Sequence, residues 1–246
     1  MIMEKSTFID AYRRILTNNG LEAFTDDALA EKFYALTVRM LEVNEYMNLT
    51  AITDLDGVIL KHYADSLTAA KYLPEGASLI DIGCGAGFPS LPLAIARPDL
   101  QITALDSTAK RINYIRETAE ILGLTNIACA AARAEDAAHD PAYREKFDIS
   151  CARAVARLNV LCELCMGYVR KGGQFVAMKA NAADELEEAE NAIAKMGGKL
   201  KCADNFSLVS DIEAEPNPRC IAVIDKNSPT PKNYPRNNAQ IKKKPL

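Results

Sequence analysis

Two hydrophobic periods divide the chain. Over the first 74 residues, apolar positions recur every three or four residues, a spacing typical of amphipathic helices. The first predicted helix presents Phe8, Tyr12, Ile15 and Leu16 on one face. The second has Thr25 as its expected N-cap, with Asp26 and Asp27 in its first turn. Its apolar stripe comprises Leu29, Phe33, Leu36, Met40 and Val43. We interpret both stripes as packing surfaces, either within this segment or against the following domain, in preference to a partner-binding surface.

Polar residues then interrupt the helical period. We expect residues 44–50 to end the second helix, and Asp54, Asp56 and Gly57 to mark a loop. A further helix follows, and it carries His62 among apolar neighbours. We interpret His62 as a structural histidine in preference to a catalytic one.

From residue 78 onward the pattern changes to short apolar runs that alternate with helical segments. This alternation predicts an α/β fold with a parallel sheet. The expected strands are residues 78–82, 101–105, 127–132, 147–151 and 172–179. The expected helices between them include residues 91–96, 107–122 and 183–196. The last two apolar stretches, 200–208 and 220–224, have no helix between them, which predicts a closing antiparallel hairpin.

The segment 78–89, SLIDIGCGAGFP, predicts a buried strand, a glycine turn and the start of a helix. Asp81 lies inside the apolar run, where a carboxylate is costly unless it is paired or meets a ligand. Gly83, Gly85 and Gly87 allow positive φ and a close approach of another molecule. Because ligands of open α/β sheets bind beside the carboxyl ends of the strands, this turn is the first candidate site.

The glycine spacing does not match the dinucleotide fingerprint, because Phe88 stands where that fingerprint needs its last glycine. A bulky residue there favours a cofactor without phosphates, such as S-adenosylmethionine. Asp106 ends the next strand, about 20 residues after the turn, which suits hydrogen bonding to ribose hydroxyls. Two simpler interpretations remain open: a tight strand-to-helix turn, and Asp106 as a helix N-cap.

Charged residues also follow the third and fourth strands. We expect one of Glu135 and Asp136 to contact an adenine amino group beside Ala134, and the other to be solvated. Arg153 falls at the end of the fourth strand. Cys162 and Cys165 have the spacing of a metal or redox pair, but no second pair completes a zinc site, so we predict no metal.

Composition adds few constraints. The 246 residues carry a net charge of −4, which argues against generic nucleic-acid binding, although residues 226–246 hold six basic residues and no acidic one. Seven cysteines, an odd number, favour reduced thiols. No apolar run is long enough to span a membrane, and the start of the chain lacks a secretory signal core. We therefore expect a cytoplasmic protein.

Several motifs together resemble the RsmG (GidB) family of bacterial small-subunit ribosomal RNA methyltransferases. They are NLTAIT at 48–53, KHYADSL at 61–67, DIGCGAGFP at 81–89, SCARAVA at 150–156, YPR at 234–236 and KKPL at 243–246. The resemblance covers nearly the whole chain. One departure is that Ala239 and Ile241 stand where the family pattern has a glycine and a proline.

The resemblance implies a class I S-adenosylmethionine-dependent methyltransferase fold, Rossmann-like, with a seven-stranded sheet. It also implies methyl transfer from S-adenosylmethionine to N7 of a guanosine in 16S ribosomal RNA, within the small ribosomal subunit or an assembly intermediate. We expect three parts: a helical extension (1–74) packed on the core, a methyltransferase domain (75–227) and a basic carboxyl-terminal tail (228–246). We expect a monomer that does not bind membranes.

The family pattern also implies the functional residues. Its cofactor contacts are Gly83, Phe88, Ala134, Glu135 and Arg153, and the strand argument adds Gly85 and Asp106. The candidates for RNA contact are Arg153, Arg157, Lys179, Arg236, Asn48 and His62. Guanine N7 carries a lone pair and no proton, so we predict no general base and no catalytic side chain of that kind. The basic tail is expected to follow phosphates, so that its removal after Asp225 weakens RNA binding more than cofactor binding.

Three other functions compete with this prediction. The first is a methyltransferase acting on a small molecule or a protein. The second is a non-catalytic interaction module that keeps the fold, and the intact Gly83, Gly85 and Asp106 argue against it. The least favoured is a dinucleotide-dependent oxidoreductase, because of Phe88.

Overall fold

The computed structural model describes residues 4–211 and 217–246. The first three residues, on which the expectation of a missing signal segment partly rests, lie outside this range, as does part of the loop before the last strand. In the described part of the chain, no helix is long and apolar enough to cross a membrane.

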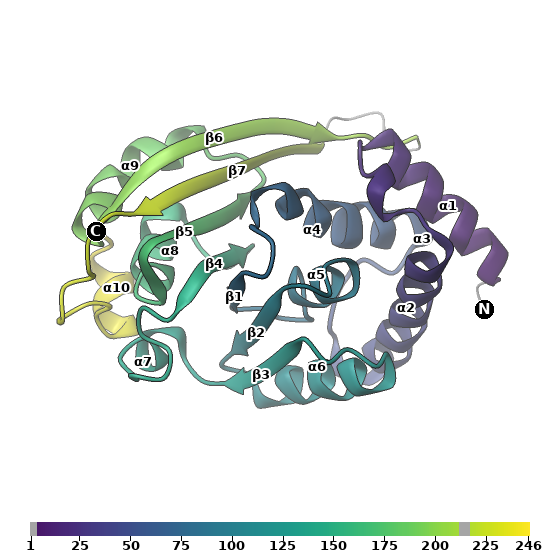
Figure 1. Ribbon diagram of the computed structural model, residues 1–246, viewed down its shortest axis with the longest axis horizontal. Coiled ribbons are helices and arrows are strands. Elements are labelled where there is room, and N and C mark those ends of the chain that lie inside the picture. The colour runs from purple at the N-terminus through teal and green to yellow at the C-terminus, as the bar shows by residue number, and fades with distance from the viewer. Residues whose placement is uncertain (1–3, 212–216) are drawn as a thin grey trace.

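A single sheet forms the centre of the molecule (Figure 1). Its strand order is β3-β2-β1-β4-β5-β7-β6 in the described part of the chain. The first five strands are parallel, and β7 is antiparallel to both β5 and β6. The strands are β1 (Ser78–Ile82), β2 (Gln101–Asp106), β3 (Ile127–Ala131), β4 (Phe147–Arg153), β5 (Val169–Lys179), β6 (Gly198–Leu208) and β7 (Asn217–Lys226). The predicted α/β fold and its closing antiparallel hairpin are confirmed.

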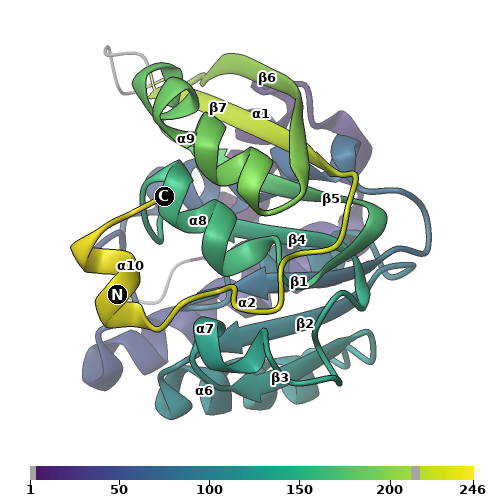
Figure 2. The same cartoon turned by 90° about the vertical axis from the view of Figure 1, so that its left-hand side faces the viewer.

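Helices cover both faces of the sheet (Figures 1 and 2). On one face, α8 (Leu158–Cys165) and α9 (Ala183–Lys195) share a buried cluster with side chains of β1, β5 and β7. On the other, α5 (Ser90–Ala96) and α6 (Ala109–Ile121) belong to a second cluster together with the amino-terminal helices. The short α7 (Ala134–Ala137) follows β3 directly.

The amino-terminal helices α1 (Lys5–Asn18) and α2 (Asp27–Met47), joined through the 3₁₀ turn η1 (Glu22–Phe24), bury their apolar stripes. The Phe33 ring lies 5.1 Å from the Tyr12 ring and 4.9 Å from the Tyr63 ring, measured between centroids. The same buried cluster contains Phe88 and Leu91, which follow the glycine turn. The stripes therefore pack both within the segment and against the sheet domain, and only Leu29 is half-buried.

Two predictions about α2 were wrong. Its N-cap is Asp26, whose carboxylate accepts a hydrogen bond from the Leu29 N–H at 2.9 Å, and not Thr25. The helix also continues through residues 44–47 and ends at Asn48, which adopts the left-handed conformation with φ of 52°. The Asn44 side chain does not break the helix, because it bonds forward to the backbone N–H and C=O of Thr50 at 2.9 and 3.0 Å and stabilises the following turn.

A winding segment of changing helical pitch leads from this turn into the sheet. It comprises α3 (Leu55–Gly57), the π-helical η2 (Val58–Ala64), α4 (Asp65–Leu67) and the 3₁₀ turn η3 (Thr68–Tyr72). Asp54 caps its start by accepting a hydrogen bond from the Gly57 N–H at 2.7 Å. π-Helical turns are rare and frequently occur at functional sites, and this one carries His62 and is followed by Asp65.

The carboxyl-terminal segment, expected to be a basic tail, packs on the domain. Lys226 is fully buried, and its Nζ donates to the Met166 carbonyl at 2.8 Å and to Thr230. Tyr234 and Ile241 are also buried, and the short helix α10 (Asn238–Lys243) lies beside α8 (Figure 2). A cut after Asp225 would therefore remove part of the core as well as surface lysines.

The packing of Phe33 gives a first test. We expect Phe33→Ala to lower the free energy of unfolding by about 3–5 kcal/mol, because it leaves a cavity between the Tyr12 and Tyr63 rings. Urea denaturation measures this change. Tyr46→Ala is the control, since Tyr46 lies on the same helix and is 70% exposed. Equally small losses of unfolding free energy in the two variants would contradict the packing of Phe33 between Tyr12 and Tyr63.

Candidate functional site

The carboxyl ends of β1, β2, β3 and β4 surround a cavity of about 330 Å³, called here the strand-end cavity. Side chains and backbone from the glycine turn, the end of β2, α7, the end of β4, α8 and α10 line it. They include Gly83, Asp106, Glu135, Ala154, Leu164 and Asn238. This is where the fold places the expected ligand site of an open α/β sheet.

The glycine turn is held in a conformation that favours glycine. Gly83, Gly85 and Gly87 have φ values of 73°, 57° and 88°. A Cβ at Gly83 would lie 2.8 Å from Cγ2 of Val155, so a side chain there would require movement of the loop after β4. The Gly85 N–H donates to the Asp106 carboxylate at 3.0 Å, which joins the end of β1 to the end of β2.

Asp106 has a second partner. Its other carboxylate oxygen accepts a hydrogen bond from the Thr108 N–H at 2.8 Å, just before α6 begins. The side chain therefore supports the start of that helix, as the simpler interpretation expected, and it also lines the strand-end cavity. One carboxylate thus orders both the glycine turn and the loop that faces it.

Asp81 is fully buried beside the same turn. One carboxylate oxygen accepts hydrogen bonds from Ser90, from the N–H at 3.2 Å and from the hydroxyl, whereas the other has no partner among the described residues. Burial raises the pKa of Asp81 to about 6. Asp81 therefore has, beside the turn, one buried carboxylate oxygen that accepts no hydrogen bond from the described residues.

The two acidic residues after β3 lie in different environments. Glu135 is buried and lines the strand-end cavity, 3.7 Å from the Arg133 guanidinium, whereas Asp136 is exposed. Contact of Glu135 or Ala134 with an adenine ring stays a prediction.

An ion-pair cluster lies at the end of β4. Asp65 accepts hydrogen bonds from two arginines, Arg153 at 2.9 Å and Arg219 at 2.8 Å. Arg153 also donates to the Lys61 carbonyl at 2.7 Å. Its guanidinium carbon lies 5.3 Å from the centre of the Phe88 ring, on which His62 stacks at 4.4 Å. One carboxylate therefore positions two cations from β4 and β7.

This cluster lines a second cavity of about 320 Å³, called here the cationic cavity. Its polar wall also contains Asn181 and the ion pair of Lys179 with Glu185, and Ala154 lines it as well as the strand-end cavity. Ala154 adopts a left-handed conformation with φ of 55°, unusual for a residue with a side chain. The two cavities therefore meet at the end of β4.

The predicted cofactor residues divide between these places. Gly83, Asp106, Ala134 and Glu135 line the strand-end cavity, Arg153 lines the cationic cavity, and Phe88 is buried in the core. Gly85 does not line the strand-end cavity, but its N–H donates a hydrogen bond to Asp106, which does.

Most candidates for RNA contact already have protein partners. Arg157 pairs with Glu188 at 2.7 Å, Lys179 with Glu185 at 2.9 Å, and Arg236 with Glu163 at 2.6 Å. His62 is buried and shares a hydrogen bond of 2.9 Å with Thr50, whereas Asn48 is exposed. Arg219 was not predicted, because nothing in the sequence brings β7 beside β5, where Cys220 pairs with Lys179.

Burial shifts the pKa of His62 and of two cysteines. Burial and the nearby charge of Arg153 lower the pKa of His62 to about 4, so the ring is neutral near pH 7. Burial raises the pKa of Cys162 to about 12 and also raises that of Cys165. Within residues 4–211 and 217–246, no group of histidine, cysteine and acidic side chains is arranged to hold a metal ion.

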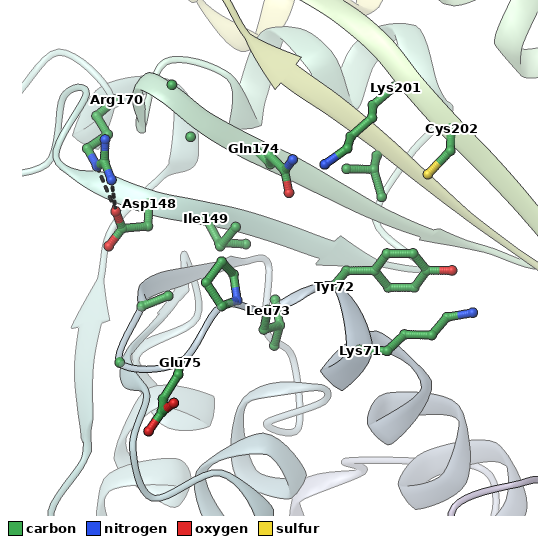
Figure 3. Close-up of a pocket in the computed structure, with 16 residues that line it drawn as sticks. Lys71, Tyr72, Leu73, Glu75, Asp148, Ile149, Arg170, Gln174, Lys201 and Cys202 are labelled. Atoms are coloured by element: carbon green, nitrogen blue, oxygen red, sulfur yellow. Dashed lines mark hydrogen bonds and ion pairs between the residues drawn. The ribbon is translucent and has the colours of Figure 1, made fainter.

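A larger cavity, of about 590 Å³, lies at the opposite edge of the sheet (Figure 3). Several of its polar groups already have protein partners. Asp148 pairs with Arg170 at 2.5 Å, and the Tyr72 hydroxyl donates to Asp204 at 2.5 Å. Leu73 and Ile149 form part of its apolar wall (Figure 3). Because it lies beside the amino-terminal ends of β1 and β4, we do not assign it to the candidate site.

Comparison with known proteins identifies close relatives. Residues 29–209 match the family model described as rRNA small subunit methyltransferase G (GidB). Proteins named ribosomal RNA small subunit methyltransferase G are 44% identical in Lachnoclostridium phytofermentans and 42% identical in Leuconostoc mesenteroides. The first alignment covers 99% of this chain and 98% of the relative, and the second covers 99% and 100%.

Solved structures share the fold at low identity. TYW2 of M. jannaschii, solved in complex with AdoMet, is 15% identical with a TM-score of 0.54, over 72% of this chain and 79% of that one. The [4+2]-cyclase SpnF has the same identity and TM-score, and the match covers 80% of this chain and 95% of the cyclase. The class I methyltransferase fold predicted from the sequence is confirmed, and the cyclase illustrates that this fold alone does not fix an activity.

The low pKa of His62 gives a second test. Its folded pKa of about 4 lies below the ordinary 6.5, so the unfolded chain binds more protons between these values and stability falls as the pH is lowered. The raised pKa of Asp81 has the opposite effect, because it makes stability rise as the pH is lowered from about 6 to about 4. We expect His62→Gln to remove the first contribution.

We expect the unfolding free energy of His62→Gln minus that of the wild type to be about 3 kcal/mol larger at pH 4 than at pH 7. Denaturant titrations at a series of pH values measure this difference. A difference between the two proteins that does not change with pH would show that His62 titrates normally.

Proposed function

Because the chain belongs to the family of ribosomal RNA small subunit methyltransferase G, we propose that it transfers the methyl group of S-adenosylmethionine to N7 of a guanosine in 16S ribosomal RNA. The observation that supports this function best is the junction of two cavities at Ala154. One has the carboxylates and glycine turn that suit an adenosine-containing cofactor, and the other has the cations that suit an RNA acceptor.

The strand-end cavity would hold the cofactor. Asp106 lines this cavity and would accept hydrogen bonds from the ribose hydroxyls. Glu135 and Ala134 also line it and would contact the adenine ring. Asp81 is fully buried beside the glycine turn, and its charge would favour a positively charged group near the turn, such as the ammonium of the methionine part. The cofactor supplies an electrophilic methyl group on a sulfonium centre.

The cationic cavity would hold the acceptor nucleotide. Asp65 uses Nη1 of Arg153 and Nε of Arg219, which leaves Nη2 of each arginine without a partner among the described residues. Guanidinium N–H groups recognise phosphate oxygens well, and phosphate contacts fix the register of a bound nucleic acid. Two arginines sharing one carboxylate keep a net positive charge in a preorganised position.

The reaction needs little further chemistry from the protein. The N7 lone pair attacks the methyl carbon as the bond from carbon to sulfur breaks, and the positive charge moves from sulfur to the guanine ring. No proton is transferred, so the residues act by binding and in-line orientation. Asp106 lines the strand-end cavity and Asp81 is buried beside the glycine turn, so two carboxylates lie on the side of the junction that would hold the positively charged cofactor.

The acceptor must present an accessible base. Side chains cannot enter the deep groove of an RNA helix, so the guanosine would lie in an exposed loop or be unstacked. We propose that the substrate is 16S RNA within the small subunit or its assembly intermediate, and that the protein acts as a monomer in the cytoplasm.

Methyl transfer tests the function directly. Purified protein, radiolabelled S-adenosylmethionine and small subunits from a strain that lacks this gene should yield label in 16S RNA, recovered as 7-methylguanosine. Wild-type subunits, already modified, serve as the control and should take up little label. Label in a small molecule or a protein, and none in RNA, would favour the competing methyltransferase function.

Arg219 provides the test of the acceptor site. We expect Arg219→Gln to raise the KM for subunits about tenfold, by loss of a charge-assisted contact, and to leave the dissociation constant for S-adenosylmethionine unchanged. Arg219→Lys should recover part of the loss. The slope of binding against salt concentration should decrease by about one.

Arg97→Gln is the matched control, since Arg97 also pairs with a carboxylate and is 19% exposed, against 18% for Arg219, but lies near the amino-terminal edge of the sheet. A similar loss in both variants, or weaker cofactor binding in Arg219→Gln, would contradict an RNA-binding role for Arg219.

A further inference from the structure

The carboxyl-terminal helix α10 contributes a wall to the strand-end cavity, through Asn238. This segment lies far along the chain from the glycine turn, and the sequence indicated only phosphate contacts for it. Figure 2 shows α10 beside α8 and α7, the two helices that supply Leu164 and Glu135 to the same cavity.

The start of α10 is held firmly in this position. Arg236 donates to the buried Glu163 of α8 three times, from its backbone N–H and Nε at 2.8 Å and from Nη2 at 2.6 Å. The His139 ring shares a hydrogen bond of 2.8 Å with the Pro235 carbonyl, and Arg144 donates to the Tyr234 carbonyl at 2.9 Å. The backbone immediately before α10 is therefore fixed to α8 and to the segment after α7.

The amide of Asn238 is not used by this scaffold. The neighbouring Asn237 caps α10 by accepting a hydrogen bond from the Gln240 N–H at 3.0 Å. Asn238 is half-buried at the cavity, and its side chain has no partner among the described residues. It thus offers one carbonyl acceptor and two N–H donors to a ligand.

The strand order indicates which part of the cofactor lies nearby. The glycine turn follows β1, the proposed ribose acceptor Asp106 ends β2, and Glu135 follows β3, the outermost of these strands. A cofactor that extends along this edge places its adenine ring near α7. Because residues 234–236 anchor α10 to α8 and to the segment directly after α7, Asn238 belongs to the same end.

We propose, on the basis of the proposed function, that Asn238 recognises the adenine base of S-adenosylmethionine. Adenine presents an amino donor beside a ring-nitrogen acceptor, and a side-chain amide pairs with these two groups simultaneously. Asn238 is therefore a specificity residue for the cofactor. The segment that carries Lys242, Lys243 and Lys244 also completes the cofactor site, so loss of the chain after Asp225 affects both ligands, contrary to the division of roles expected from the sequence.

Isothermal titration with S-adenosylhomocysteine, the reaction product, tests this assignment without catalysis. We expect Asn238→Ala to weaken binding about five- to tenfold, the effect of a lost pair of hydrogen bonds, with an unchanged unfolding temperature in the absence of ligand. Gln240→Ala is the matched control, because it removes an exposed amide from the same helix that does not line the cavity.

A second ligand separates recognition of the base from general packing. S-Inosylhomocysteine carries a ring carbonyl in place of the amino group, so the wild type should prefer S-adenosylhomocysteine and Asn238→Ala should lose most of that preference. Unchanged affinity and preference in Asn238→Ala would overturn the proposal and leave the proposed function intact. An equal loss in Gln240→Ala, or a lower unfolding temperature of Asn238→Ala, would also overturn it. Failure of the wild type to bind S-adenosylhomocysteine would instead contradict the proposed function itself.

Discussion

The hydrogen bond from the Gly85 N–H to Asp106 is the contact on which the candidate site depends. It joins the turn after β1 to the end of β2, while the second oxygen of the same carboxylate supports the start of α6. Charge-assisted hydrogen bonds of this kind contribute about 1.5–3 kcal/mol each, and this one fixes a turn in which Gly83, Gly85 and Gly87 adopt positive φ at little steric cost. The position of α5, and through it the packing of Phe88 against the amino-terminal helices, follows from that turn.

A second carboxylate organises the cationic cavity. Asp65 follows the π-helical turn, Arg153 ends β4 and Arg219 begins the buried part of β7, so one ion-pair cluster connects three segments that are distant in the sequence. Removal of Asp65 would leave two neighbouring arginines without their shared carboxylate, which is destabilising, whereas removal of Arg219 leaves the neutral pair of Arg153 and Asp65. The helical extension is therefore part of the site, because it supplies the carboxylate that fixes both arginines.

The sequence predicted those features that depend on local pattern. Alternating apolar runs indicated the strands, and three glycines beside Asp81 indicated the turn. Features that depend on pairing between distant segments could not be predicted. Arg219 reaches the cationic cavity because β7 inserts between β5 and β6, and Asn238 reaches the strand-end cavity because Arg236 binds Glu163. For the same reason, the sequence could not show that three of the candidates for RNA contact, Arg157, Lys179 and Arg236, each form an ion pair with a glutamate.

The central claim is that the cofactor binds in the strand-end cavity, between Asp106 and Glu135, and not in the larger cavity at the other edge of the sheet. Equilibrium binding of S-adenosylhomocysteine to Asp106→Asn and to Asp148→Asn compares the two directly, since each variant neutralises one carboxylate that bonds to backbone in its own cavity. The claim requires at least tenfold weaker binding in Asp106→Asn and unchanged binding in Asp148→Asn, with both proteins folded. Unchanged binding in Asp106→Asn together with a loss in Asp148→Asn would contradict it.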